Sequence, residues 1–191
     1  MNEEIKIKRV WAMPSKDTFT IKPIAELLRR YVPSKPNNWI DPFAGFHSVA
    51  SITNDLNIKA PTDYHLEAVD FIKSFLLVSR NGEPAIPQFD GALFDPPYSL
   101  RQIMECYNGI GKVPDKKWVT TKFYPDVKNE LAKVIKPGGL CISFGWNTIG
   151  LGKIRGFEII EVLVVSHGRL HNDTLVTVER KIYNLPRGLA K

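Results

Sequence analysis

Apolar residues along the chain follow two spacings, one typical of helices and one typical of short buried strands. Residues 20–32, 68–79 and 124–136 carry apolar side chains three and four positions apart, which predicts three amphipathic helices. Continuous apolar runs at residues 39–40 and 91–94 predict strands buried on both faces, as in a parallel sheet. Strands and helices that alternate in this way predict an α/β protein.

The last part of the chain has a different pattern. Residues 157–166 and 174–182 are two apolar-rich segments separated by the polar stretch 167–173. Two such segments joined by a polar turn predict an antiparallel hairpin. A predicted strand at residues 140–144 precedes them, so we expect a mostly parallel sheet that ends in an antiparallel pair.

The first half of the chain leaves little room for helices between its strands. Two further short strands are predicted at residues 49–55 and 62–67, and only six residues separate Gly45 from Ile52. A parallel crossover with its helix needs about a dozen residues or more. We therefore expect both crossover helices to be absent or reduced to a turn. An apolar sheet face without helical cover marks an interface, so we expect a second subunit, identical or not, to cover it.

Composition narrows the class of protein. The chain has 191 residues, of which 43% are hydrophobic, as expected of one globular domain spanning 1–191. No apolar run approaches the roughly 18 residues of a membrane helix, and the charged start of the chain has no signal-like region. Cys106 and Cys141 are distant in sequence, so we expect no disulfide, no metal site and a cytoplasmic protein. The formal net charge of +6 favours a polyanionic partner.

The strand at residues 91–94 ends abruptly in Asp95-Pro96-Pro97-Tyr98. Two prolines cannot continue a strand ladder, so the chain must turn at the carboxyl end of the strand, where open α/β sheets bind ligands. The Asp95 carboxylate and the Pro96 carbonyl can both accept hydrogen bonds from an amino group. The Tyr98 ring can stack on a base, which is worth roughly 1–3 kcal/mol. This set of groups suits methylation of an exocyclic amine on a planar base.

The tetrad resembles the catalytic motif of S-adenosylmethionine-dependent amino-methyltransferases, above all the DNA N6-adenine enzymes, in a small form without a separate target-recognition domain. The resemblance implies a Rossmann-like class I methyltransferase sheet, S-adenosylmethionine as cofactor and DNA as substrate. It assigns catalysis to Asp95, Pro96, Pro97 and Tyr98, and it also places Asp95 beside the cofactor. Methyl transfer would be direct and in line.

Three further elements resemble the cofactor site of this family. The loop Asp41-Pro42-Phe43-Ala44-Gly45 is similar to the family's D-P-F-x-G-x-G loop, which faces the methionine part of the cofactor. His47 replaces the last glycine, and its side chain could crowd the cofactor or add a contact. The resemblance further assigns the methionine carboxylate to Thr20 and Lys22, the ribose hydroxyls to Asp55, and the adenine amino group to Glu67, with Asp63 as a weaker candidate.

The substrate would meet a different part of the chain. Residues 99–123 are predicted to be partly irregular and form the candidate substrate loop, whereas residues 1–17 form an N-terminal arm without a readable role. A basic loop with an aromatic residue can contact phosphates and unstacked bases. The substrate-binding candidates are Tyr98, Ser99, Lys116, Lys117, Trp118 and His167.

Two alternatives to a DNA enzyme are compatible with the same residues. An RNA base amino-methyltransferase, including a guanine-N2 enzyme, would carry a similar tetrad. A non-catalytic methyltransferase-like subunit would keep the fold without the cofactor, and His47 together with the reduced helices favours this alternative. The intact tetrad argues against it, because an inactive site has no physical need for Asp95 and Tyr98 together. The sequence leaves open the target motif and the biological role.

Overall fold

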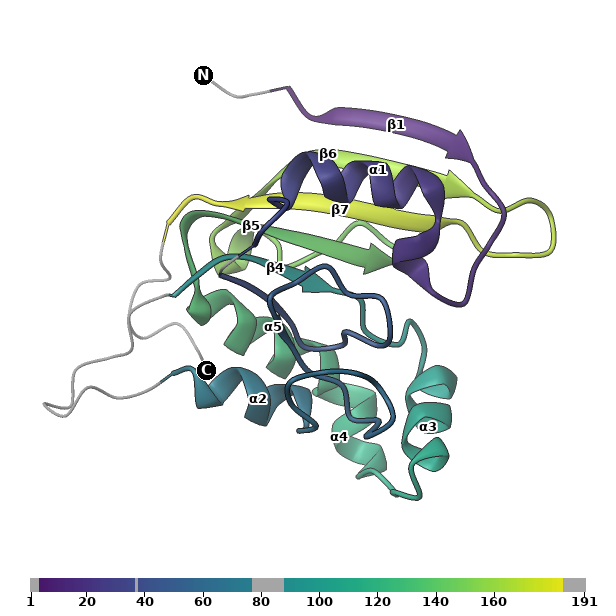
Figure 1. Cartoon of the computed structure of the whole chain (residues 1–191), viewed down its shortest axis with the longest axis vertical. Coiled ribbons are helices and arrows are strands. Elements are labelled where there is room, and N and C mark those ends of the chain that lie inside the picture. Colours follow the sequence, from purple (N-terminus) through teal and green to yellow (C-terminus); the bar gives the residue numbers. More distant parts are fainter. Residues whose placement is uncertain (1–3, 37, 77–87, 184–191) are drawn as a thin grey trace, which may run out of the picture.

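The computed structural model describes residues 4–36, 38–76 and 88–183, and the strands within these ranges form one sheet (Figure 1). Its strands are β1 (Lys6–Trp11), β2 (Trp39–Asp41), β3 (Ile52–Thr53), β4 (Phe89–Phe94), β5 (Ile135–Gly145), β6 (Phe157–Ser166) and β7 (Thr174–Lys181). They lie in the order β1-β6-β7-β5-β4-β2-β3. Strands β3, β2, β4 and β5 are parallel, and β7 runs antiparallel to both β5 and β6. The predicted Rossmann-like sheet with a terminal antiparallel hairpin is therefore confirmed.

Strand β1 was not predicted. It adds to the outer edge of the sheet and pairs in parallel with β6, from Lys6 opposite Glu161 to Trp11 opposite Ser166. Because β1, β4 and β6 run in the same direction, their carboxyl ends lie at the same end of the sheet. The N-terminal arm is in this way connected to the sheet edge where α/β proteins bind ligands.

The described helices are η1 (Thr18–Thr20), α1 (Lys22–Tyr31), α2 (Ala68–Ser74), α3 (Leu100–Gly109), α4 (Lys116–Thr121), α5 (Phe123–Val134) and η2 (Lys153–Arg155). The three predicted helices correspond to α1, α2 and α5, and the predicted end of the second, residues 77–79, lies outside the described residues. The 99–123 segment was predicted to be partly irregular, and the structure shows α3 and α4 over most of it with residues 110–115 as the irregular link between them. Among the described residues, no helix has the length and apolar character needed to cross a membrane.

Two apolar cores lie on opposite faces of the sheet, because successive strand residues point to opposite sides. On one face, Leu27 of α1 belongs to the same buried cluster as Leu93 and Ile142. On the other face, Leu131 of α5 is clustered with Ala92 and with residues of α2. Figure 1 shows α1 on one side of the sheet and α2 and α5 on the other.

The connections from β2 to β3 and from β3 onward contain turns and no helix within residues 42–51 and 54–63, all of which the structure describes. The predicted reduction of the first-half crossovers is confirmed. The strands there are shorter than predicted, since β3 has two residues and the third strand is reduced to one parallel bridge between Asn54 and Tyr64. In Figure 1 these connections are the dark blue loops beside β4.

A tryptophan covers part of the sheet beside the missing helices. The Trp39 side chain is 3% exposed and lies over Gly91, where an added Cβ would be 2.5 Å from the indole ring. Phe46 and Val49, in the following loop, are exposed. A second subunit over this region stays a prediction.

Candidate functional site

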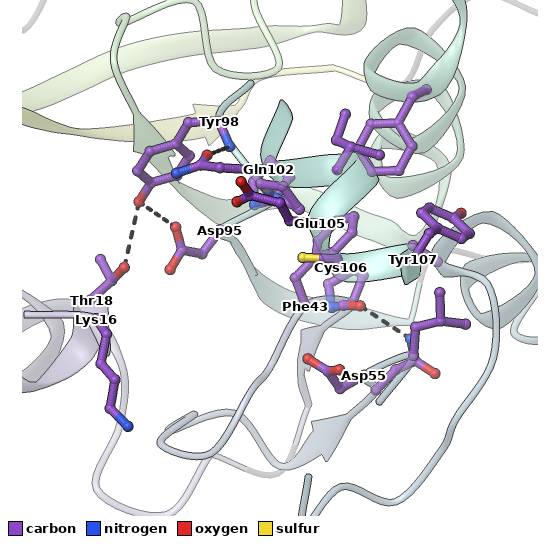
Figure 2. A pocket seen from close by; sticks show the side chains of 18 of the residues that line it. Lys16, Thr18, Phe43, Asp55, Asp95, Tyr98, Gln102, Glu105, Cys106 and Tyr107 are labelled. Atoms are coloured by element: carbon purple, nitrogen blue, oxygen red, sulfur yellow. Dashed lines mark hydrogen bonds between the residues drawn. The ribbon is translucent and has the colours of Figure 1, made fainter. Parts of the chain in front are cut away.

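A cavity of about 640 Å³ opens at the carboxyl ends of β2 and β4, and residues from η1, the β2–β3 loop and α3 complete its wall (Figure 2). Its volume is within the range of about 300–1,000 Å³ that is usual for small-molecule sites. The wall includes the whole tetrad that follows β4. The strongest sequence-based candidate for chemistry therefore lies at the cavity that the fold itself favours for ligands.

Hydrogen bonds fix the conformation of the tetrad. The Tyr98 hydroxyl donates to Oδ1 of Asp95 over 2.5 Å, and the Tyr124 hydroxyl donates to the Pro97 carbonyl over 2.5 Å. The Tyr98 ring also meets Trp146 edge to face, with a centroid distance of 5.7 Å. Each carboxylate oxygen can accept more than one hydrogen bond, so Asp95 keeps acceptor capacity for a ligand.

The position of Asp95 changes its acidity. Burial raises the pKa of Asp95 to about 6, against the opposing effect of hydrogen bonds from Tyr98 and Thr18. Burial, followed by the neighbouring Asp95 charge, raises the pKa of the Tyr98 hydroxyl above its ordinary value. Tyr98 consequently keeps its proton at neutral pH and acts as the donor, whereas Asp95 is mainly an acceptor above about pH 6.

The 41–45 loop is held from within by Asp41. This side chain is fully buried, with Oδ1 accepting from the Phe43 amide over 3.0 Å and Oδ2 accepting from the Ser48 hydroxyl over 2.6 Å. Burial raises the pKa of Asp41 to about 7, and the nearby charges of Asp95 and Asp55 add to that increase. Asp41 therefore shapes the loop from behind and does not line the cavity.

Asp55 joins the loop to the next segment of chain and faces the cavity. Its Oδ2 accepts from the Gly45 amide over 3.0 Å, and its Oδ1 accepts from the Asn57 amide over 2.8 Å. Gly45 has a φ of 54°, a conformation that glycine adopts without strain. Both Asp55 oxygens retain a second lone pair, which is what binding of a vicinal diol requires.

Asn54, which the sequence did not single out, connects this loop to the segment before α2. Its amide nitrogen donates to the carbonyls of Pro42 and Leu66, and its Oδ1 accepts from the Leu66 amide. The following Glu67 lines the cavity, and its Oε2 accepts from the Tyr107 hydroxyl of α3 over 2.6 Å. Asn54 thus holds Leu66 in place and thereby positions the next residue, Glu67, at the cavity wall.

Eight of the predicted site residues line the cavity, and they come from four separate parts of the chain: Pro42, Phe43, Asp55, Glu67, Asp95, Pro96, Pro97 and Tyr98. Of the other cofactor candidates, Ala44 and Gly45 belong to the loop without lining the cavity. Thr20, at the end of η1, and Lys22, at the start of α1, are exposed and do not line the cavity. Their predicted place at the cavity wall is occupied by Lys16 and Thr18 of the preceding segment (Figure 2).

The remaining substrate candidates do not line this cavity. Ser99 caps α3, and Lys116 and Lys117 are exposed on α4. The Trp118 indole donates to Asp126 over 2.9 Å. The fifth candidate, His167, is buried between the Ala12 carbonyl and the Thr174 hydroxyl, at 2.9 and 2.8 Å.

His47, which replaces a glycine of the family pattern, does not line the cavity either. Its ring is exposed, and its Nε2 lies 3.6 Å from Oδ2 of Asp17. The side chain therefore points to the segment before η1, outside the cavity wall, and its effect on cofactor binding stays a prediction.

Charge in the cavity is mainly negative. The acids Asp55, Glu67, Asp95 and Glu105 line it, and Lys16 is the one basic residue among the described residues of the wall. Within the described parts of the chain, no group of His, Cys, Asp and Glu is arranged to hold a metal ion. The cavity suits a ligand that carries a positive charge and several hydrogen-bond donors.

Sequence comparisons give no relative, because no protein-family model and no curated protein matches the chain. Solved structures do match. TrmN from Thermus thermophilus is 18% identical with a TM-score of 0.51, over 85% of this chain and 49% of TrmN. The 1,6-didemethyltoxoflavin-N1-methyltransferase of Burkholderia thailandensis, with bound 1,6-didemethyltoxoflavin and S-adenosylhomocysteine, is 16% identical with a TM-score of 0.46, over 83% and 76% of the two chains. The chain spans about half the length of TrmN and shares its Rossmann-like α/β fold.

Proposed function

We propose that the protein transfers a methyl group from S-adenosylmethionine to the exocyclic amino group of a nucleobase, with N6 of adenine in DNA as the substrate. The observation that carries the proposal is the single cavity that Asp95 and Tyr98 share with Asp55 and Glu67. Residues suited to holding an amine and residues suited to holding a nucleoside cofactor thus line the same space. The Rossmann-like fold supports the same conclusion.

The residues of the cavity fit S-adenosylmethionine. Asp55 would accept hydrogen bonds from the two ribose hydroxyls, and the half-buried Phe43 offers an apolar face to the adenine. The Lys16 ammonium and the Thr18 hydroxyl would bind the methionine carboxylate. The excess of carboxylates favours the sulfonium charge. When bound, this cofactor supplies an electrophilic methyl group.

The tetrad would prepare the amine for attack. The Asp95 carboxylate and the Pro96 carbonyl would accept hydrogen bonds from the two amino hydrogens, which draws the nitrogen lone pair out of conjugation with the ring. Because Tyr98 and Tyr124 hold the turn, both acceptors are positioned before the base enters. Asp95 would take the proton that the methylated nitrogen releases. Its pKa of about 6 leaves it ionised, and hence able to act as a base, at neutral pH.

The choice between DNA and RNA depends on other features of the chain. The net charge of +6 suits DNA and RNA equally. The aspartate that begins the tetrad, together with the D-P-F start of the 41–45 loop, favours adenine in DNA. An RNA substrate is the second candidate, and the same experiment distinguishes the two.

The direct test is transfer of a radiolabelled methyl group from S-adenosylmethionine to DNA and RNA strands of matched sequence, followed by nucleoside analysis. We expect N6-methyl-2′-deoxyadenosine from DNA, and no transfer by Asp95→Ala. Transfer to RNA alone would replace DNA by the second candidate. Transfer to neither by a folded protein that binds the cofactor would contradict an independent enzyme and favour a non-catalytic subunit.

A further inference from the structure

Gln102 lies in the first turn of α3, at the wall of the cavity. Its backbone amide donates to the hydroxyl of Ser99, the capping residue of the helix, over 3.2 Å. Its half-buried side chain reaches from the helix to Tyr98 and lines the same cavity as Asp95 (Figure 2). Tyr98 connects the two side chains, because its backbone bonds to Gln102 and its hydroxyl bonds to Asp95.

The orientation of the Gln102 amide follows from its contact with the backbone. The Tyr98 amide donates to Oε1 of Gln102 over 2.6 Å, so the atom that faces this N–H must be the carbonyl oxygen. The other end of the amide is then the NH2 group. No acceptor within the described ranges of the chain bonds to this Nε2. A hydrogen-bond donor therefore remains available at the cavity wall.

Helix capping accounts for the carbonyl oxygen of the Gln102 amide but not for its NH2 group. Ser99-Leu100-Arg101-Gln102 has the S-x-x-Q pattern of a capping box, in which Gln or Glu accepts from the backbone amide of the capping residue, although here Gln102 accepts from Tyr98, one residue earlier. That role uses the carbonyl oxygen alone. A glutamate would perform it equally well and would also favour the positive end of the helix dipole. The NH2 group of Gln102 is the feature that capping does not require.

We propose that Gln102 reads the target base by donating a hydrogen bond from Nε2 to the ring nitrogen next to the amino group. The inference rests on the proposed function, since it assumes that the amine is bound by Asp95. An acceptor at Asp95 and a donor at Gln102 are complementary to the Watson–Crick edge of adenine, where the N6 amino group neighbours the acceptor N1. The same edge of guanine places N1–H beside the 2-amino group and would oppose one donor to another.

On the Watson–Crick edge, the site thereby selects bases that combine an amino group with an unprotonated neighbouring ring nitrogen, whereas guanine has such a nitrogen, N3, only on the edge beside the sugar. Adenine has this pattern at N6 and N1, and cytosine has it at N4 and N3. The hydrogen-bond pattern is the same for these two bases. This selection favours an adenine enzyme over the guanine-N2 alternative, which the tetrad alone does not do.

The test compares DNA strands that carry adenine, 1-deazaadenine or 7-deazaadenine at the target position. For the wild type, removing N1 should lower kcat/KM by about 10- to 100-fold, whereas removing N7 should change it little. Gln102→Glu keeps the acceptor for the Tyr98 amide and turns the donor into an acceptor. Gln102→Met removes the amide without adding charge. Both variants should lose activity on adenine and show no further loss on 1-deazaadenine.

Comparison of substrates within each variant separates this contact from the altered reactivity of the deaza base. If replacing adenine by 1-deazaadenine lowered kcat/KM equally in the wild type and in both variants, the proposed role of Gln102 would be overturned. Equal wild-type activity on adenine and 1-deazaadenine would overturn it too. Cofactor affinity by calorimetry should stay near the wild-type value in both variants, and so should the Tm of Gln102→Glu, whereas Gln102→Met should have a lower Tm because it loses the acceptor for the Tyr98 amide. Absence of methyl transfer to every strand by the wild type would instead overturn the proposed function, and the inference with it.

Discussion

The two halves of the sheet are held together by different kinds of contact. Around β2 and β3, polar side chains bond to the backbone of neighbouring turns and take the place of the missing crossover helices. From β4 to β7, buried apolar side chains pack against α1 and α5. Both halves contribute to the cavity, and in the first half the residue proposed to bind the cofactor ribose, Asp55, also holds the loop in place.

Asp41, Asn54 and Asp55 are the main connections of the polar half. Together they accept from or donate to the backbone of the 42–45 loop and of the residues before α2. In the packed half, Leu131, Ile142 and Val178 are completely buried. Apolar packing is not specific to any ligand, whereas a carboxylate such as Asp55 both closes the loop and faces the cavity. We therefore expect stability and cofactor affinity to be coupled in the first half and separable in the second.

The largest expected effect concerns Asp95, where the two halves meet. Asp95→Ala removes the acceptor for the amine but leaves Asp55 and the 41–45 loop intact. Methyl transfer should fall by about 10³-fold or more, with cofactor affinity changed by less than about threefold. Turnover measurements and calorimetry on the same sample check this result. Tyr98→Phe is the matched control, because it removes the hydrogen bond to Asp95 and keeps the ring. A large loss of cofactor affinity in Asp95→Ala would contradict the division between the halves.

Two destabilising variants, one in each half of the sheet, test whether stability and cofactor affinity are coupled only in the first half. Leu131→Ala leaves a cavity in the packed core and should lower the free energy of unfolding by about 3 kcal/mol, without changing cofactor affinity. Asn54→Ala leaves two carbonyls and one amide unpaired and should cost about 2 kcal/mol. Only Asn54→Ala should also weaken cofactor binding. Denaturant unfolding with calorimetry checks both values, and equal losses of affinity in the two variants would remove the distinction.

The pH dependence of turnover should follow Asp95. Its pKa of about 6 is raised from the ordinary value, so the ionised acceptor is lost as the pH falls below that point. At saturating cofactor, kcat should decrease about tenfold per pH unit below 6 and be nearly constant above it. Saturation is needed because Asp41, with a pKa of about 7, can alter the cofactor loop over a similar range. A kcat that is constant down to pH 5 would exclude Asp95 as the group that must be ionised.

The smallest expected effect is at His47. His47→Gly restores the glycine of the family loop, but the side chain is exposed and near Asp17, outside the cavity. Cofactor affinity should change by less than about twofold, as measured by calorimetry. A tenfold or greater gain would mean that the histidine reaches the cofactor after all.

Much of the packed half could be predicted from the sequence. The terminal hairpin, the buried β4 strand and the helices α1 and α5 have regular apolar patterns, because each buries one face or both. The tetrad was placed correctly at a strand end because two prolines must end a strand. The absence of crossover helices followed from the small number of residues between the predicted strands of the first half.

The missed features depend on contacts between distant residues. In β1 every residue except Val10 is exposed, so its apolar pattern carries no signal, and its position depends on pairing with β6. Gly111 and Pro114 favoured an irregular segment, yet they only mark the short link between α3 and α4. Lys16 and Thr18 reach the cavity because η1 turns the chain before α1. Local sequence does not reveal that turn.

Titration calorimetry of S-adenosylmethionine into the wild type and Asp55→Ala tests the central claim most directly. We predict a Kd in the micromolar range for the wild type and an affinity about 10- to 100-fold lower for Asp55→Ala, because Asp55 both closes the loop and would bind the ribose. Absence of binding by the folded wild type at millimolar cofactor would contradict the assignment of this cavity to the cofactor. Equal affinity in the two proteins would contradict the role of Asp55.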